Sequence, residues 1–316
     1  MPRHILRHRT RRLLSALTSA IVVVGGLVAA APAPAPAPAD ARARGYGSYV
    51  ALGDSFASFG TATKIHGEPA GCARATDNYP NDLARSLGVA HFADASCAGA
   101  KTADMASPQR LQPLGENPPQ FDALTPDTDL VTVTISGNDT LAEILATCLQ
   151  GSLTNPLGHP CRQHYTAGGT DRAAAMIDAV APKVAGVLDG IHQRSPHATV
   201  VLVGYLPLLP PTTGCWPLVP IARGDVPYVH GLWQRMHTML GAVAGSHNAL
   251  FSNPGNVLGH DACRPPGAKW TEGLLPTSPS APLHPNAAGQ AYVAALRSRC
   301  PIDHEDGSAR TGSLVG

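Results

Sequence analysis

Short runs rich in β-branched residues alternate along this chain with longer stretches that have the composition of helices. The two clearest runs, residues 130–136 and 199–205, are rich in Val and Ile and are bounded by turn-forming residues. Near-continuous apolar runs of this kind are typical of strands that are buried on both faces of a parallel sheet. The expected strands are residues 49–53, 91–95, 130–136, 199–205 and 250–252.

The intervening stretches predict the helices that such a sheet requires. The expected helices are residues 81–87, 141–149, 172–193, 229–244 and 287–299, the third with a kink at Pro182. Alternating strands and helices predict an α/β fold, a doubly wound three-layer sandwich around a central parallel sheet of about five strands. Long loops in compact domains usually carry function, and the loops at 206–227 and 253–284 are therefore candidates for it.

The N-terminal segment, residues 1–39, has the organisation of a secretory signal peptide. A basic cluster at residues 3–12 precedes an apolar run and an Ala-Pro repeat, and this order favours cleavage over a retained membrane anchor. An arginine pair in the cluster also resembles a twin-arginine export signal, and either route predicts a secreted, extracellular protein. We expect one domain over residues 40–302, no stable membrane anchor after cleavage, and a disordered tail over residues 303–316.

The charge balance argues against a nucleic-acid partner, and the cysteine content predicts disulfides. The 23 basic and 22 acidic residues nearly cancel, so the sequence implies no basic surface for nucleic acid. Seven cysteines in an exported chain favour disulfides. Pairing of sequence neighbours joins Cys72 to Cys97, Cys148 to Cys161 and Cys215 to Cys263, and leaves Cys300 free. A zinc site around His159, Cys161 and His164 is the alternative, but it lacks a second cysteine pair, and we expect neither a metal nor a cofactor.

The end of the first expected strand carries a candidate nucleophile. Gly53, Asp54 and Ser55 follow one another there, which places the Ser55 hydroxyl at the carboxyl edge of the sheet, where α/β folds bind ligands. Gly53 permits a tight turn, after which a backbone amide is free to face an anionic oxygen. The tripeptide alone is also typical of a plain turn, and the chain has no Gly-x-Ser-x-Gly nucleophile elbow.

Three further short blocks stand near the ends of expected strands or before the last helix. With the first they form the series Gly53-Asp54-Ser55, Ser96-Cys97-Ala98-Gly99-Ala100, Ile135-Ser136-Gly137-Asn138-Asp139 and Leu283-His284-Pro285-Asn286. This series resembles that of the SGNH, or GDSL, family of serine hydrolases, and looks most like its secreted actinobacterial esterases and lipases. The resemblance spans residues 49–299 and implies an SGNH-hydrolase, flavodoxin-like fold. It also implies hydrolysis of carboxylic esters, with lipid or simple acyl esters as substrates.

Carried over residue by residue, the resemblance implies roles for four residues. Ser55 is the nucleophile that forms an acyl-enzyme, and His284 is its general base. The backbone amides of Ser55 and Gly99 and the Asn138 side chain form the oxyanion hole, because these groups donate hydrogen bonds without carrying charge. From its local sequence alone, Asn138 is equally well explained as a turn residue. His284 stands out among the 14 histidines because a Pro-Asn helix start directly follows it.

Two positions depart from the family pattern. Ser136 stands where the family usually has glycine, which is expected to matter little. Ala281 stands where the family commonly has an aspartate, three residues before the catalytic histidine. A Ser-His-Asp triad of the usual form is therefore absent. The expected acceptors for the His284 ring are the backbone carbonyls of Ala281 and Pro282, and a carboxylate elsewhere, such as Asp261 or Glu272, is the alternative.

Two other functions remain open from the sequence. A polysaccharide acetylesterase would use the same groups, and an inactive secreted binding protein on the same fold would account for the missing carboxylate at Ala281. In each case we expect a monomer whose partner is an ester or a similar ligand. Trp216 and Trp270, in the two long loops, are expected either to line the acyl site or to pack in the core.

Overall fold

The computed structural model describes residues 45–295. The chain divides into two compact units, residues 1–41 and 42–316, and every described residue belongs to the second. The expected signal peptide at 1–39, Cys300 and the expected tail at 303–316 lie outside the described residues.

One parallel sheet organises the described part of the chain. Its strands are β1 (Ser48–Gly53), β2 (His91–Asp94), β5 (Leu130–Thr134), β6 (Thr199–Val203) and β7 (Leu250–Ser252). They lie in the order β2-β1-β5-β6-β7, and each neighbouring pair is parallel. The order reverses direction between β1 and β5, which makes the ends of these two strands the switch point where such sheets bind ligands. The predicted α/β fold is confirmed.

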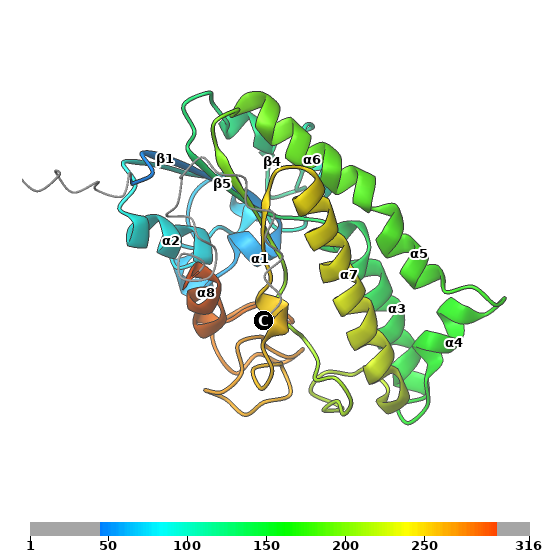
Figure 1. Ribbon diagram of the computed structural model, residues 1–316. Helices are drawn as coiled ribbons and strands as arrows, with labels where there is room; N and C mark the ends of the chain where they lie inside the picture. The colour runs from blue at the N-terminus through cyan, green and yellow to red at the C-terminus, as the bar shows by residue number, and fades with distance from the viewer. Residues whose placement is uncertain (1–44, 296–316) are drawn as a thin grey trace, which may run out of the picture. The chain divides into compact units, whose positions relative to one another are not determined.

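Helices cover both faces of this sheet (Figure 1). On one face α2 (Tyr79–Leu87) packs beside α8 (Ala287–Ala294). The other face carries α3 (Leu141–Thr154), α5 (Arg172–Ala179), α6 (Ala181–Arg194) and α7 (Val226–Ser246). The remaining elements are two short helices, α1 (Ser55–Ser58) and α4 (Pro160–Thr166), and a small antiparallel hairpin of β3 (Gln109–Arg110) and β4 (Glu116–Asn117).

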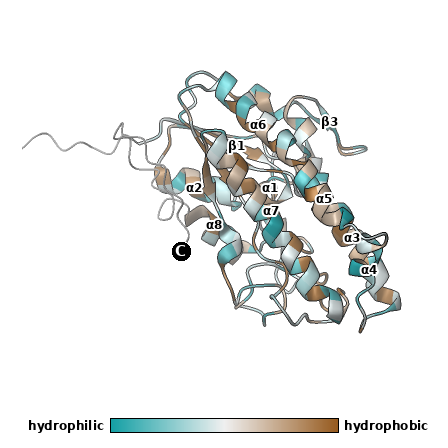
Figure 2. Ribbon diagram, turned by 45° about the vertical axis from the view of Figure 1, so that its right-hand side comes forward, coloured by the Kyte–Doolittle hydropathy of each residue, from teal (hydrophilic) through white to brown (hydrophobic). Residues whose placement is uncertain are grey.

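Alternation along the strands divides the core into two layers. In β1, Val50 and Leu52 pack toward α6 and α7, whereas Tyr49 and Ala51 pack toward α2 and α8. All five residues of β5 are buried. This burial from both sides explains why the strands appear in the sequence as continuous apolar runs. The helices that cover the sheet carry mixed hydrophobic and hydrophilic residues along their length (Figure 2).

The structure corrects several predicted boundaries. The predicted helix over 172–193 is two helices, because α5 ends at Ala179 and α6 begins at Ala181. Pro182 lies in the first turn of α6, where proline breaks no helical hydrogen bond, so it does not kink a helix there. The strand predicted over 199–205 ends at Val203. The helix α4 was not predicted from the sequence.

Three disulfides fasten the loops, in the pairs predicted from sequence order. Cys72 is bonded to Cys97, Cys148 to Cys161, and Cys215 to Cys263. The second bridge joins α3 to α4 and removes Cys161 as a zinc ligand; the third joins the two long loops. Each bridge stabilises the fold by roughly 2–4 kcal/mol, largely by restricting the unfolded chain.

Candidate active site

The nucleophile candidate sits where β1 turns into α1. Gly53 has a φ of 144°, and a Cβ there would lie 2.6 Å from the Thr134 carbonyl oxygen of the neighbouring strand, so only glycine fits. The Asp54 amide donates to that same carbonyl at 2.8 Å. The Asp54 carboxylate then caps α1 by accepting from the Phe56 amide at 2.9 Å. This turn presents Ser55 at the start of a single helical turn, at the carboxyl edge of the sheet.

The ring of His284 lies between Ser55 and a backbone carbonyl. Its Nε2 is 2.8 Å from Ser55 Oγ, and its Nδ1 is 2.7 Å from the Pro282 carbonyl oxygen. Because a carbonyl can only accept, Nδ1 carries the hydrogen and Nε2 is free to accept from the serine hydroxyl. The Ala281 carbonyl, the other acceptor expected from the sequence, instead accepts from the backbone amide of His284 at 3.3 Å.

The segment that carries His284 is held by pairing with the chain at residues 271–273. The Glu272 amide donates to the His284 carbonyl at 2.9 Å, and the Leu283 amide donates to the Gly273 carbonyl at 3.2 Å. Asn286 caps α8 by accepting from the Gly289 amide at 3.1 Å. The histidine is thus fixed on one side by strand-like pairing and on the other by a helix start.

Glu272 organises this loop from inside without touching the His284 ring. Its fully buried carboxylate accepts from Lys269 at 2.8 Å, Asn286 at 3.0 Å, the Thr277 amide at 2.9 Å and Ser278 at 2.7 Å. Burial alone would raise the pKa of Glu272, but these hydrogen bonds outweigh it and lower the pKa to about 2. These contacts do not match the alternative of Glu272 as the partner of the His284 ring.

Hydrogen bonds tie the second and third blocks to each other. Gly99 adopts a φ of 76°, the left-handed conformation that favours glycine. Asn138, in the short turn Gly137–Asp139, donates from Nδ2 to the Ala100 carbonyl at 3.0 Å. This bond uses one of the two hydrogens of the amide group. The Asp139 carboxylate accepts from the Thr102 amide at 3.0 Å and from its hydroxyl at 2.7 Å.

Tyr205 is a site residue that the sequence reasoning missed. Its hydroxyl donates to the Asp54 carboxylate at 2.7 Å and accepts from the Gly137 amide at 2.8 Å, so it links the first block to the third. Burial raises the pKa of Asp54 to about 7, although hydrogen bonds from Tyr205 and the Phe56 amide oppose this rise. Tyr205 lies just beyond β6, although the expected strand over 199–205 included it. A tyrosine at the carboxyl end of a strand was the signal that could have identified it.

Two aromatic rings lie against His284. The ring centroids of Phe56 and Phe59 lie 5.0 and 4.7 Å from that of His284. Burial lowers the pKa of His284 below its ordinary value of 6.5, and the hydrogen bond to Pro282 opposes this shift. The ring is therefore neutral at pH 7, the form that accepts a proton.

The two loop tryptophans have different surroundings. Trp270 stacks on His260 with ring centroids 3.6 Å apart and packs against Tyr292 at 4.1 Å, so it has the packing role expected as the alternative. Trp216 remains 40% exposed.

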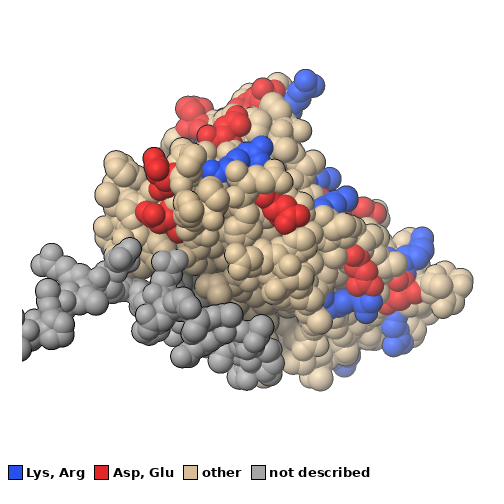
Figure 3. All heavy atoms as spheres, turned by 45° about the horizontal axis from the view of Figure 1, so that its top comes forward, with Lys and Arg blue, Asp and Glu red and all other residues tan. Residues whose placement is uncertain are grey.

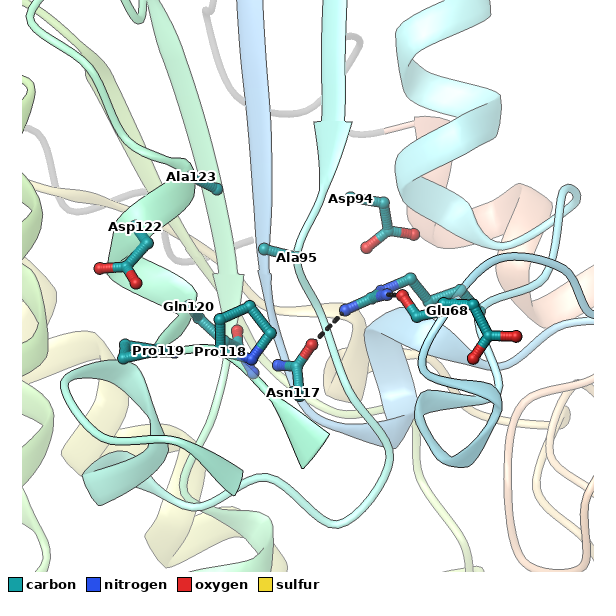
Figure 4. A pocket seen from close by; sticks show the side chains of 10 residues that line it. Glu68, Asp94, Ala95, Asn117, Pro118, Pro119, Gln120, Asp122 and Ala123 are labelled. Atoms are coloured by element: carbon teal, nitrogen blue, oxygen red, sulfur yellow. Dashed lines mark hydrogen bonds between the residues drawn. The ribbon is translucent and has the colours of Figure 1, made fainter. Parts of the chain in front are cut away.

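A cavity of about 310 Å³ has no residue of the four blocks in its lining (Figure 4). Arg74 and Asn117, which are hydrogen-bonded to each other at 2.7 Å, are among the residues that line it. Gln120, also in its lining, bonds the Gly53 amide at 2.7 Å and carbonyl at 2.9 Å. This cavity backs onto the end of β1 rather than opening on Ser55.

Within residues 45–295, no group of three or more His, Cys, Asp or Glu side chains is placed to hold a metal ion. No helix in that range is both long enough and apolar enough to cross a bilayer. On the face shown in Figure 3, acidic and basic side chains are interspersed.

Comparison with known proteins identifies the class of this site. The GDSL-like lipase/acylhydrolase family matches residues 51–292, and the chain belongs to this family. The chain is similar to Lipase 2 of Streptomyces coelicolor, with 36% identity over 253 residues that cover 78% of this chain and 83% of that protein. It is therefore a carboxylic ester hydrolase with the SGNH fold.

Two solved structures are similar in both sequence and fold. Phospholipase A1 from Streptomyces albidoflavus NA297 superposes with a TM-score of 0.64 at 26% identity, covering 81% of this chain and 100% of its own. An extracellular lipase from Streptomyces rimosus superposes with a TM-score of 0.60 at 26% identity, covering 79% of this chain and 98% of its own. All four blocks lie within residues 51–292, the region that matches the family.

Proposed function

We propose that this enzyme hydrolyses esters through an acyl-enzyme on Ser55, with His284 as the general base. The observation that carries the proposal is the chain of contacts from Ser55 Oγ to His284 Nε2 at 2.8 Å, and from His284 Nδ1 to the Pro282 carbonyl at 2.7 Å. This is the arrangement of nucleophile, base and orienting group that activates a serine.

The proposed reaction has two halves. Ser55 Oγ attacks the ester carbonyl carbon while His284 takes the hydroxyl proton, and His284 then returns that proton to the leaving alcohol. Water next attacks the acyl-enzyme with His284 again as base, which releases the acid and restores Ser55. The amides of Ser55 and Gly99 and the second hydrogen of Asn138 Nδ2 receive the oxyanion, and removing one such donor typically costs about 10²–10³ in rate.

The orienting group in this proposal is a dipole rather than a charge. The Pro282 carbonyl holds the productive tautomer of His284, and Ala281 occupies the place of the usual carboxylate. Pro282 and Pro285 flank the histidine with fixed φ angles, which preorganises the acceptor. The site works as a Ser-His dyad.

Lipid or simple acyl esters are the proposed substrates, and the protein is proposed to be secreted as a monomer after cleavage of residues 1–39. The signal-like leader supports secretion, and the Streptomyces rimosus relative is described as extracellular. The runner-up is a polysaccharide acetylesterase. Comparing p-nitrophenyl esters of acetate and of a long-chain acid separates the two, because an acetylesterase turns over only the short ester.

Replacing the nucleophile tests the proposal. Ser55→Ala is expected to lower kcat on p-nitrophenyl acetate by at least about 10⁴, since nothing else can form the acyl-enzyme. Ser58→Ala is the matched control: Ser58 is buried in the same helical turn, and among the described residues its hydroxyl has no hydrogen-bond partner. Ser58→Ala should retain turnover. If Ser55→Ala kept more than about one hundredth of the wild-type kcat, the assignment would be wrong.

A further inference from the structure

Exposed apolar side chains gather on the two long loops next to the catalytic histidine. Trp216 is 40% exposed, Leu218 54%, Leu274 42% and Leu275 73%. We call these four residues the apolar rim. Single exposed leucines are common on soluble proteins, but contiguous ones beside a catalytic site indicate a binding surface.

Backbone hydrogen bonds make the apolar rim continuous with the active site. The Leu274 amide donates to the Leu218 carbonyl at 3.1 Å, which places the two loops side by side. Two further bonds connect the residues before Leu274 to His284 and its neighbour. The Leu283 amide donates to the Gly273 carbonyl at 3.2 Å, and the Glu272 amide donates to the His284 carbonyl at 2.9 Å. In Figure 1 these loops, coloured yellow-green and orange, lie below the sheet.

A disulfide fixes the loop that carries Trp216. Cys215, the neighbour of Trp216, is bonded to Cys263 on the other long loop. A tethered loop loses little conformational freedom when it binds, so its exposed side chains are prepared for contact.

The stretches of the two loops that carry the apolar rim lack charged side chains, whereas Arg223 and Asp225 lie further along the first loop and Asp261, Arg264, Lys269 and Glu272 lie earlier in the second. The sequence has no Asp, Glu, Lys or Arg at residues 195–222 or at residues 273–296. Attraction to an anionic membrane requires clustered Lys or Arg near the surface. Trp and Leu without such charges instead suit the boundary between headgroups and acyl chains, where apolar burial supplies the affinity.

We propose that the apolar rim docks the enzyme onto a lipid surface that carries no net charge. This inference rests on the proposed function, since docking there would bring ester groups of the lipid to Ser55 and His284. Trp216, Leu218, Leu274 and Leu275 enter the surface, while the interspersed charges elsewhere on the molecule stay in water. Binding of this kind depends on apolar area and depends little on salt.

Vesicle binding tests the docking surface apart from catalysis. The catalytically disabled Ser55→Ala protein is mixed with vesicles of zwitterionic phosphatidylcholine, and the bound fraction is measured by sedimentation. Adding Leu275→Ser is expected to weaken binding by about tenfold, the loss expected for one buried leucine. The matched control is Leu114→Ser. Leu114 is also exposed, at 58%, but it lies in the β3–β4 turn between Arg110 and Glu116, and its replacement should leave binding unchanged.

A kinetic ratio provides the second measurement, made in the protein with Ser55 intact. The rate on an emulsified long-chain ester divided by the rate on soluble p-nitrophenyl acetate should fall about tenfold in Leu275→Ser and stay constant in Leu114→Ser. Thermal unfolding verifies that both variants fold.

Three outcomes would overturn the docking surface while leaving the chemistry of Ser55 intact. These are equal vesicle binding by Leu275→Ser and Leu114→Ser, loss of wild-type binding when salt is raised to about 0.5 M, and an unchanged kinetic ratio in Leu275→Ser. Failure of the proposed catalytic role would appear separately, as turnover by Ser55→Ala.

Discussion

The His284 ring donates to a neutral group, the Pro282 carbonyl, and the absence of a charge there affects the pKa of His284. The Pro282 carbonyl offers a dipole at 2.7 Å from Nδ1, whereas a carboxylate would stabilise the charged imidazolium and raise its pKa. With Phe56 and Phe59 against the ring, burial is the larger influence and lowers the pKa of His284. His284 therefore loses its proton more readily than an ordinary histidine.

The pH profile measures this directly. Because only the neutral ring accepts the serine proton, kcat/KM for p-nitrophenyl acetate should rise with pH as His284 loses its proton. The midpoint of that rise should fall below the ordinary histidine value of 6.5, with a plateau through neutral pH. A midpoint clearly above 6.5 would indicate a carboxylate partner for the ring.

Two features of single residues were not predictable from the sequence, the backbone conformation of Ser136 and the carbonyl that orients His284. Ser136 has a φ of 104° and is fully buried, so the family's usual glycine reflects backbone conformation, a point the sequence reasoning treated as minor. A left-handed conformation costs a non-glycine residue about 1–2 kcal/mol. The sequence also left undecided which carbonyl, that of Pro282 or that of Ala281, accepts from the His284 ring. The answer depends on the positive φ of Leu283, at 63°, and the pairing of Leu283 with Gly273 supports this conformation.

At the scale of elements, the loop that carries His284 is built around one buried ion pair. Lys269 is 5% exposed and Glu272 is fully buried, and their charged atoms are 2.8 Å apart. The folded-state pKa of Glu272, about 2, lies below its ordinary value of 4.5. Its contribution to stability is therefore present above about pH 4.5 and is lost as the pH falls toward 2.

Glu272→Gln separates support of the loop from catalysis. The change leaves the Lys269 charge buried without its counter-charge, so the free energy of unfolding should fall by about 3–5 kcal/mol in chemical denaturation at pH 7. Under conditions where the variant is folded, kcat/KM should fall less than about tenfold, since loss of a triad carboxylate costs roughly 10⁴.

A double variant controls for the charge. Lys269→Met with Glu272→Leu removes both charges and should recover part of the lost stability. A loss of kcat/KM of about a thousandfold in folded Glu272→Gln would instead point to a concealed triad.

At the scale of the whole molecule, the parts that are local in sequence were predicted and the parts that depend on distant contacts were not. Strands β1 and β5 were predictable because burial on both faces leaves an apolar run, and three disulfides followed from cysteine order. Tyr205 was placed inside a strand, yet its hydroxyl bonds Asp54, 151 residues earlier in the chain. Only the assembled sheet, with β1 and β5 at its switch point, brings such groups together.

Labelling with a fluorophosphonate, followed by peptide mapping, tests the central claim most directly, because the reagent reacts with an activated serine and not with an ordinary hydroxyl. The account predicts one adduct in the folded protein, on Ser55, and at least about a thousandfold slower labelling when His284→Ala removes the base. Absence of an adduct on Ser55 in folded protein, or an equal rate of labelling without His284, would contradict the assignment of these two residues as nucleophile and base.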